Sequence, residues 1–409
     1  MNDAKVIVVG GGPAGCFAAV ECAGAGAAVG GVEVLEQGPE FLAKVRVSGG
    51  GRCNLTHACF DPGELARHYP RGERELIGPF RRFQPRDTIA WFEARGVKLK
   101  TEPDGRIFPA SNSSKTIVEC LLGAARAADV RQRSGCGVER AARRDGGGFE
   151  LTLSGGESAR CERLLLATGG CRTEAGGALA VALGHTLEPP VPSLFTFRVE
   201  TPWLRQLAGV SVPSAEISVP DTELRERGPL LATHSGVSGP AVLRLSARGA
   251  RLLHDRDYRF ALCVNWLPER NAEALAAELQ ARRRTEGARR VVASPFAPLP
   301  ARLWGRLACA AGLRSDTRWA DLSREGELSL IRQLTRTELP VSGRDAGRGE
   351  FVTCGGVRLS EVDFRTMESR ICPGLYFAGA LLDLDGLPGG FNFQAAWTTG
   401  WLAGRAMAG

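Results

Sequence analysis

The sequence predicts an α/β protein whose parallel sheet is assembled from both ends of the chain, with other domains inserted between them. Near the N-terminus, a continuous apolar run over residues 5–9 leads into a glycine turn and a helix. Near the C-terminus, residues 374–400 supply a short apolar strand, a glycine-rich turn and another helix. Between these ends the composition changes at the Pro-Pro-Val-Pro run of residues 189–192. These three observations predict a split α/β domain with an insertion.

The first turn has the Gly-x-Gly-x-x-Gly spacing of a Rossmann-like dinucleotide site. Its first glycine permits a tight turn, the second lets a diphosphate approach the backbone, and the third lets the helix pack on the strand. The helix N-terminus then offers N–H groups and a positive dipole end to the diphosphate. Glu36 follows the third glycine by 21 residues, at the end of the next strand, where a carboxylate accepts hydrogen bonds from ribose hydroxyls. The residues assigned to this half of the site are Gly10, Gly12, Pro13, Ala14, Gly15 and Glu36.

A second glycine-rich stretch, over residues 44–57, follows Glu36. We expect a valine-rich strand over residues 44–47 and then consecutive backbone N–H groups that form a concave site for anionic oxygens. A plain surface turn is the alternative. The arginine would add a fork of donors, the asparagine would contact a ribityl chain or a flavin edge, and the cysteine is either redox-active or a packing thiol. The residues concerned are Ser48, Gly49, Gly50, Gly51, Arg52, Cys53 and Asn54.

The next hundred residues read as two helices and a set of strands. Residues 85–96 have the apolar spacing of an amphipathic helix, and residues 105–128 read as a turn, a serine-rich N-cap and a second helix. Residues 130–170 look like a β-meander that ends in a buried strand and a small-residue turn. Because ligands bind beyond the carboxyl ends of parallel strands, Thr168 and Gly169 in that turn are expected near the cofactor.

The insertion is predicted to hold two parts. Strand patterns at residues 195–200, 215–219 and 230–246 indicate a β-rich domain, and residues 267–336 are helical in pattern and rich in arginine. The predicted boundaries are 1–190 and 350–409 for the cofactor domain, 191–266 and 337–349 for the β-rich domain, and 267–336 for a helical subdomain.

Composition excludes several classes of protein. Twelve scattered cysteines without a C-x-x-C pair and five histidines indicate neither a disulfide framework nor a metal site. No apolar stretch reaches the length of a membrane span, so a cytoplasmic protein without a membrane partner is expected. The net charge of +7 is carried almost entirely by arginine. One cluster of arginines is either a solvated helix end or a patch for RNA. It comprises Arg282, Arg283, Arg284, Arg289 and Arg290.

The C-terminal segment indicates which dinucleotide is bound. A nicotinamide-only Rossmann domain has no need of a second glycine turn, whereas a large, two-ended cofactor such as FAD does. The N-terminus of the last helix would stabilise the negative charge that a flavin ring gains on reduction. The residues that open this helix, or reach from it, are Gly389, Gly390, Phe391, Asn392 and Gln394.

The chain also resembles a known family. GGGPAG, SGGGRCNLT, GRIFPASN, THSGVSGPAVLRLS, FVTCGGV, TMESR and PGLYFAGALLDLDGLPGGFNFQ together resemble the BaiN/RdsA-like family of NAD(P)/FAD-dependent oxidoreductases. The resemblance covers nearly the whole chain and implies an FAD domain in two segments, with Val138 touching the adenine end through its backbone. The family places an acid after the Ala-Gly of the C-terminal strand, where this chain has Ala380 after Gly379, so a ribityl hydrogen bond is either missing or made by Asp383. The stretch between Gly15 and Glu36 is also about three residues longer than is usual in flavoproteins.

The resemblance implies reduction of an electron-poor C=C bond, with NAD(P)H as a transient donor because no second Gly-x-Gly-x-x-Gly unit is present. His234 is the candidate proton donor, since its pKa range suits acid chemistry near neutral pH; a structural histidine in a turn is the alternative. A small-molecule substrate is expected. The other functions left open are an RNA uracil reductase, an amine oxidase and a non-catalytic flavin carrier.

Overall fold

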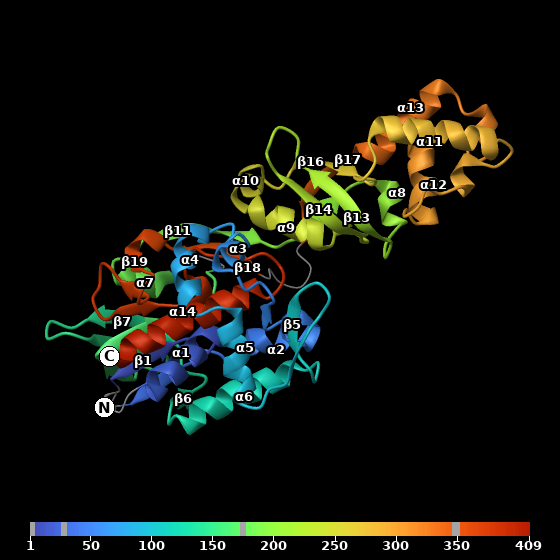
Figure 1. The fold of residues 1–409 in the computed structure, drawn as a ribbon. Helices are drawn as coiled ribbons and strands as arrows, with labels where there is room; N and C mark the ends of the chain where they lie inside the picture. Colours follow the sequence, from blue (N-terminus) through green and yellow to red (C-terminus); the bar gives the residue numbers. More distant parts are fainter. Residues whose placement is uncertain (1–4, 26–30, 172–176, 346–351) are drawn as a thin grey trace. The chain divides into compact units, whose positions relative to one another are not determined.

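The computed structural model describes residues 5–25, 31–171, 177–345 and 352–409 (Figure 1). The chain divides into two compact units, one formed by Met1–Pro192 with Val352–Gly409 and the other by Ser193–Phe351. Residues 26–30, which belong to the stretch between Gly15 and Glu36 that is expected to be longer than in other flavoproteins, lie outside the described ranges.

A seven-stranded sheet forms the centre of the first unit. In spatial order its strands are β19 (Val362–Asp363), β20 (Glu368–Ser369), β21 (Leu375–Phe377), β10 (Arg163–Leu166), β1 (Val6–Val9), β2 (Val32–Leu35) and β6 (Arg131–Arg133). The five strands from β21 to β6 run parallel, and β19 and β20 are antiparallel additions at one edge. All four residues of β1 are buried, as expected of a strand covered on both faces. Because β1 and β21 come from opposite ends of the chain, the predicted α/β fold with a Rossmann-like sheet is confirmed.

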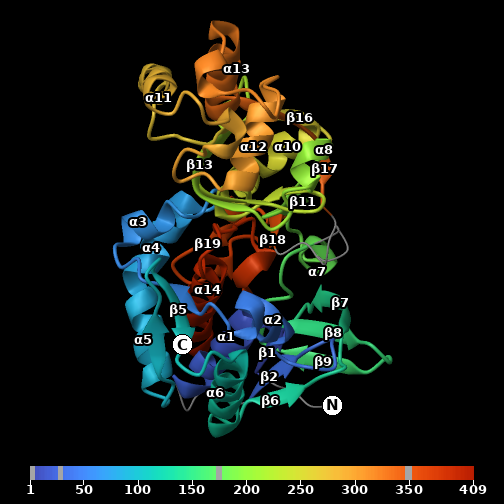
Figure 2. The ribbon, with the colours of Figure 1, turned by 90° about the vertical axis from the view of Figure 1, so that its right-hand side faces the viewer.

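Helices α1 (Pro13–Gly24) and α14 (Phe391–Ala408) pack against each other, and both views show them together (Figures 1 and 2). The close approach depends on two glycines of α14. A Cβ atom on Gly400 would lie 2.6 Å from the carbonyl oxygen of Ala14, and one on Gly404 would lie 2.5 Å from that of Ala18. The first and last helices of the chain are therefore a single packed layer.

Smaller elements complete the first unit. Its other helices are α2 (Ala43–Gly51), α3 (Pro62–Ala66), α4 (Glu73–Arg82), α5 (Pro85–Glu93), α6 (Ser114–Ala127) and α7 (Ala178–Ala182). Two three-stranded antiparallel sheets are β3 (Thr56–His57), β5 (Arg106–Pro109) and β4 (Leu99–Thr101), and β7 (Val138–Arg143), β8 (Phe149–Leu153) and β9 (Ser158–Cys161). Strands β11 (Leu187–Ser193) and β18 (Val352–Val357) form a two-stranded ribbon. The helices expected over residues 85–96 and 105–128 are present as α5 and α6, the latter preceded by strand β5.

Three local predictions were wrong. Residues 44–47 are helical in α2, where Val45 is buried and Val47 is 76% exposed, a contrast that fits helical rather than period-two spacing. The expected meander is split, because β6 joins the parallel sheet while β7 to β9 form a separate sheet. Residues 241–246 lie in helix α9 (Pro240–Arg248), which buries Ala241, Val242 and Leu245 along one side.

The second unit contains a closed six-stranded antiparallel barrel, visible in Figure 2. In order around the barrel its strands are β12 (Phe197–Val199), β15 (Gly236–Ser238), β14 (Arg225–Ala232), β13 (Ser211–Ser218), β16 (Phe260–Asn265) and β17 (Thr337–Arg344). The helices near the barrel are α8 (Pro202–Arg205), α9 and α10 (Ala250–Asp255). Helices α11 (Ala272–Thr285), α12 (Ala301–Ala310) and α13 (Arg324–Thr335) form the helical part around the buried rings of Phe296, Trp304 and Trp319. Among the residues described, no helix is both long and apolar enough to span a membrane.

Candidate cofactor site

The turn between β1 and α1 is shaped by three glycines with different steric surroundings. Gly10 has φ +111°. A Cβ atom there would overlap the carbonyl oxygen of Ala167, the residue that follows β10. A Cβ atom on Gly15 would overlap the carbonyl oxygen of Gly10, so this glycine is required for the helix to approach the turn. A Cβ atom on Gly12 would meet no atom within 4 Å. Two of the glycines therefore serve packing, and the third faces open space.

Helix α1 begins beside that open space without a side-chain cap. Gly12 is its N-cap residue, Pro13 is its first residue, and no acidic side chain lies in the first turn. The N–H of Cys16 is bonded to the carbonyl oxygen of Gly12, at 2.9 Å, while the earlier N–H groups have no partner within a regular helix. Uncapped N–H groups and the positive helix end together favour an anionic ligand.

Glu36 lies at the end of β2, directly beside this turn. Its Oε2 accepts the N–H of Gly11 and its Oε1 accepts the N–H of Gly38, both at 2.7 Å. Each carboxylate oxygen has a second lone pair, so the half-buried group can also accept bonds from ribose hydroxyls. Two residues before Val138, the N–H of Cys136 donates to the backbone oxygen of Glu36 at 2.8 Å, which places the start of β7 near this end of the site.

The three glycines at the end of α2 depart from helical geometry and form an open turn. Gly49, Gly50 and Gly51 all have positive φ, from +56° to +83°, a conformation that other residues rarely adopt. Cβ atoms on Gly50 and Gly51 would meet nothing within 4 Å, as at Gly12. Ser48 is extended, and its hydroxyl donates to the carbonyl oxygen of Val45 at 2.8 Å. A ligand can therefore approach the backbone of this turn closely.

The three residues that follow the turn have separate surroundings. Nη1 of Arg52 donates to Glu102 at 2.7 Å, and the guanidinium lies 4.1 Å from the centre of the Phe108 ring, so part of the expected donor fork is already engaged. Cys53 is buried, and burial raises the pKa of its thiol to about 12, so it is a packing thiol. Asn54, with its amide oriented by its neighbours, donates to the carbonyl oxygen of Thr56 at 3.1 Å and accepts from the N–H of Gly390 at 2.9 Å.

The contact between Asn54 and Gly390 brings the two distant glycine segments together. Gly389 and Gly390 have φ values of +140° and +95°, and α14 begins at the next residue without a side-chain cap or an acidic first turn. A Cβ atom on Gly390 would lie 2.7 Å from the carbonyl oxygen of Thr56. The amide of Asn392 closes the turn through Gly386, donating to its oxygen at 2.8 Å and accepting from its N–H at 2.9 Å.

Two residues of the last helix have roles that the sequence analysis did not assign. Gln394 is fully buried, and its Oε1 accepts the hydroxyls of Thr56, at 2.6 Å, and Thr88, at 2.9 Å. The protein itself therefore encloses the Gln394 side chain in this structure, and its contact with a flavin stays a prediction. The ring of Phe391 is also buried and is stacked by two histidines, His57 at 4.8 Å and His68 at 4.1 Å between ring centres.

The ends of β1, β10 and β21 meet at the same edge of the parallel sheet. A Cβ atom on Gly10 would lie 3.0 Å from the N of Thr168, and one on Gly379 would lie 2.9 Å from the Cβ of Ala14. Gly169 has φ +84°, and a Cβ atom there would lie 3.2 Å from Nζ of Lys44. The half-buried Asp383 donates its N–H to the carbonyl oxygen of Val357 at 3.0 Å.

His234 belongs to the second unit, where it lies at the exposed turn between β14 and β15. In the first unit, sequence reasoning missed His57, His68, Tyr69, Arg71, Asp385 and Lys44, which lie beside the two glycine segments or their turns. Asp385 stands within a quoted motif and Lys44 begins the glycine-rich stretch of residues 44–57, but nothing in the sequence separates either from its neighbours. Among the described residues no cluster of His, Cys, Asp or Glu could hold a metal ion.

These observations fit a large dinucleotide with an aromatic second end. Open space at Gly12, Gly50 and Gly51 leaves room for a ligand against bare backbone, and the uncapped starts of α1 and α14 supply two separate electropositive positions. Glu36 offers remaining lone pairs for a ribose.

Comparison with known proteins agrees with this geometry. Residues 4–406 match the family described as HI0933-like protein Rossmann domain. The ribosomal RNA dihydrouridine synthase of Escherichia coli is 33% identical, over 100% of this chain and 98% of that protein. The 3-dehydro-bile acid delta(4,6)-reductase of Clostridium scindens is 30% identical, over 99% of each.

Solved structures extend the likeness of the fold. The 3-ketosteroid-delta4-(5alpha)-dehydrogenase of Rhodococcus jostii has a TM-score of 0.54 at 15% identity, over 100% of this chain and 97% of that one. At that identity the likeness concerns the fold alone. The family match and the two relatives, by contrast, span nearly the whole sequence, and they confirm the resemblance found from the motifs. The chain belongs to the HI0933-like Rossmann-domain family.

Proposed function

We propose that the protein is an FAD-dependent oxidoreductase that reduces a C=C bond conjugated to a carbonyl, with electrons from NAD(P)H. The observation that carries the proposal is the meeting of two glycine segments, more than 300 residues apart, through Asn54 and Gly390. A dinucleotide with a single nicotinamide end would use the first segment only. Both relatives named above support the reaction class, because a dihydrouridine synthase and a Δ4,6-reductase each saturate a conjugated C=C bond.

The chain's residues divide the work of binding between two ends. Glu36 accepts the hydroxyls of the adenosine ribose, and the N-terminus of α1 beside Gly12 binds the diphosphate. The N–H groups of Ser48–Gly51 bind the cofactor closer to its ring end, where the N-terminus of α14 stabilises negative charge. When bound, FAD supplies hydride chemistry, taking two electrons from NAD(P)H and passing them to the carbon β to the carbonyl.

The donor and the proton source are parts of the same proposal. The sequence has no second Gly-x-Gly-x-x-Gly unit, so NAD(P)H would bind transiently rather than in a domain of its own. His234, exposed in the second unit, remains the candidate proton donor, and its replacement by Gln should lower turnover without changing FAD affinity.

Anaerobic reduction tests the proposal directly. Protein reconstituted with FAD should show flavin absorption bands that NADH or NADPH bleaches, and an enone steroid or a uridine-containing RNA should restore them. Absence of flavin bands after reconstitution would refute the cofactor. Peroxide release with an amine, and no reoxidation by an enone or RNA, would instead identify an oxidase; reduction by dithionite alone, without turnover, would identify a flavin carrier.

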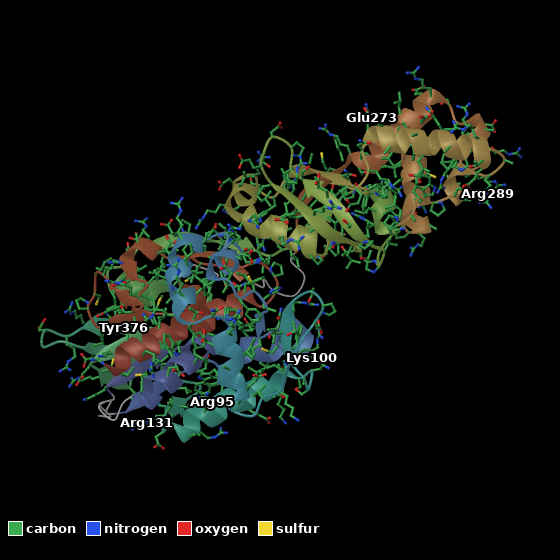
Figure 3. All side chains as sticks on the ribbon, in the orientation of Figure 1. Arg95, Lys100, Arg131, Glu273, Arg289 and Tyr376 are labelled. Carbon is green, nitrogen blue, oxygen red and sulfur yellow. The ribbon has the colours of Figure 1, made fainter. Side chains whose placement is uncertain are left out.

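A second candidate, reduction of uracil within RNA, is favoured by the charge of the helical part of the second unit. Residues 267–336 contain thirteen arginines, eight acidic residues and no lysine. Arg283, Arg284, Arg289 and Arg290 are exposed at and beyond the end of α11. Figure 3 shows Arg289 beyond this end and Glu273 at the start of the helix.

Arg282 does not belong to this exposed group. Its guanidinium donates to the carbonyl oxygen of Ser294 at 2.8 Å and lies 4.2 Å from the centre of the Phe296 ring. Because its side chain holds the loop after α11, we leave Arg282 out of the proposed RNA-binding group.

The salt dependence of RNA binding discriminates between the two candidates. If the exposed arginines neutralise phosphates, log affinity should fall steeply with log salt concentration, and replacing Arg283 and Arg284 by Gln should reduce the slope by about 1 to 2. A matched double replacement of two exposed arginines on α13, Arg324→Gln and Arg332→Gln, should leave the slope unchanged. Equal slopes for both double variants would remove this support for RNA.

A further inference from the structure

The turn that precedes α14 is held by a short segment from the N-terminal half of the chain. We refer to residues 68–71 as the clamp. The N–H of Leu387 donates to the carbonyl oxygen of His68 at 2.8 Å, and the hydroxyl of Tyr69 donates to the carbonyl oxygen of Phe391 at 2.6 Å. Arg71 forms a two-pronged ion pair with Asp385 through Nε and Nη2, and the two residues are also bridged through their backbones.

The clamp is screened from water. The side chain of Asp385 is 0% exposed and that of Arg71 is 15% exposed. Tyr69 is fully buried, and burial raises the pKa of its hydroxyl, which therefore stays protonated as a donor. Planar, two-pronged arginine–carboxylate pairing fixes direction as well as distance. A buried ion pair often adds little net stability compared with apolar side chains of similar size, so its main effect here is on geometry.

The opposite side of the same turn is fixed by other contacts already described. Asn392 ties both backbone groups of Gly386, and Asn54 accepts the N–H of Gly390. Gly389 and Gly390 supply the positive φ values that let the chain reverse into α14. The direction of the first N–H groups of α14 therefore depends on the clamp on one side and on the two asparagines on the other.

We propose that Arg71 is a positioning residue for the reacting end of the cofactor. Through Asp385 it holds the N-terminus of α14 where its uncapped N–H groups stabilise the negative charge that the flavin ring gains on reduction. The adenosine half of the site is built by other residues, Gly12 and Glu36. The inference rests on the proposed FAD function, since it concerns the same site.

The test separates cofactor affinity from cofactor potential. Arg71→Met alone removes the ion pair of the buried Asp385 carboxylate. The informative variant is therefore the double replacement Arg71→Met with Asp385→Leu, which removes both charges. FAD affinity and the two-electron midpoint potential are measured for the wild type, the double variant and Arg71→Lys. The control is Arg160→Met, which breaks an ion pair with Glu150 at 2.9 Å on strands β8 and β9 of the same unit.

The double variant should bind oxidised FAD with an affinity within about threefold of the wild type. The ratio of its affinity for reduced FAD to its affinity for oxidised FAD should be about fivefold lower than in the wild type. That ratio is a fall of about 20 mV in the two-electron potential. Arg71→Lys, which retains the charge without the planar fork, should fall between the wild type and the double variant. The control should keep the wild-type potential.

Tyr69→Phe provides a second measurement that keeps both charges. Loss of its hydroxyl bond to Phe391 should lower the potential in the same direction by a smaller amount. Unchanged potentials in Tyr69→Phe and the double variant, or an equal fall in Arg160→Met, would overturn the positioning role while leaving the FAD proposal intact. A wild-type protein that binds no FAD would instead refute the proposed function.

Discussion

Replacing Gly12 by Ala should weaken FAD binding without weakening the protein. The backbone of Gly12 has φ −81° and ψ −174°, which alanine adopts freely, and its added methyl group would meet no protein atom within 4 Å. At a helix N-cap, alanine is less favourable than glycine, but it also restricts the unfolded chain. Since these effects oppose each other at similar size, the free energy of unfolding of FAD-free protein should change by less than about 0.5 kcal/mol.

The affinity for FAD should fall much more, because the methyl group enters the space that we assign to the diphosphate. A hydrogen bond to a charged group is worth about 1.5 kcal/mol net, so displacing one or two of them should weaken binding by about 10- to 100-fold. With free FAD at 100 times the wild-type Kd, the stabilisation by ligand should drop from about 2.7 kcal/mol to between about 1.4 and 0.4 kcal/mol.

Chemical unfolding with and without FAD, together with a titration of flavin fluorescence, measures both quantities. Gly15→Ala is the matched control, because its methyl group would overlap the carbonyl oxygen of Gly10 and should cost about 1–3 kcal/mol even without ligand. If Gly12→Ala binds FAD within about twofold of the wild type, the diphosphate does not lie against Gly12, and the assignment of this turn is wrong.

Three other predictions concern different parts of the chain. Glu36→Gln should lower FAD affinity about tenfold and the free energy of unfolding by about 1 kcal/mol, because an amide NH₂ must then face the N–H of Gly11 or Gly38. Unchanged affinity in the same flavin titration would show that Glu36 does not bind the ribose. Arg282→Met should lower the free energy of unfolding by about 1–3 kcal/mol, because the contacts of its guanidinium are lost. The control Arg283→Gln should change that free energy by less than about 0.5 kcal/mol. Similar values for the two variants in urea unfolding would contradict a structural role for Arg282. Burial lowers the pKa of His185 below its usual value of about 6.5. As the pH falls, the unfolded chain therefore binds the extra proton before the folded protein does. The stability that His185 contributes is complete above about pH 6.5 and is lost as the pH falls below that value. His185→Gln should flatten this part of a stability–pH profile, and an unchanged profile would exclude His185 as its cause.

The parallel sheet and the two glycine segments could be predicted from sequence because their causes are local. A buried parallel strand is continuously apolar, as in β1, and a turn that requires positive φ needs glycine, as at Gly10 and Gly390. The run of four residues 44–47 was too short for its apolar pattern to distinguish a helix from a strand. The 76% exposure of Val47 is set by where α2 lies in the fold and not by the local sequence.

Partners that are far apart in the chain left no such signal. Gln394 follows the glycine turn by four residues, so the sequence placed it near the flavin, but Thr56 and Thr88 enclose it from elements more than 300 residues away. The pairing of Arg71 with Asp385 spans 314 residues, and neither residue differs in its local pattern from charged neighbours that lie on the surface. Tertiary contacts of this kind decide the role of a side chain after the backbone has been specified.

The packing of α1 against Gly400 and Gly404 has a consequence for synthesis of the chain on the ribosome. Because Gly400 and Gly404 follow α1 by some 380 residues, α1 and β1 emerge from the ribosome well before this packing is complete. The barrel and helices α8 to α13 of the second unit are translated in between and can fold first, in reverse of the usual N-terminal-first order. During that interval the N-terminal apolar segments are exposed to chaperones and to other nascent chains, and a ribosome that stalls shortly before Gly400 would release a polypeptide with a folded middle and an unfinished beginning.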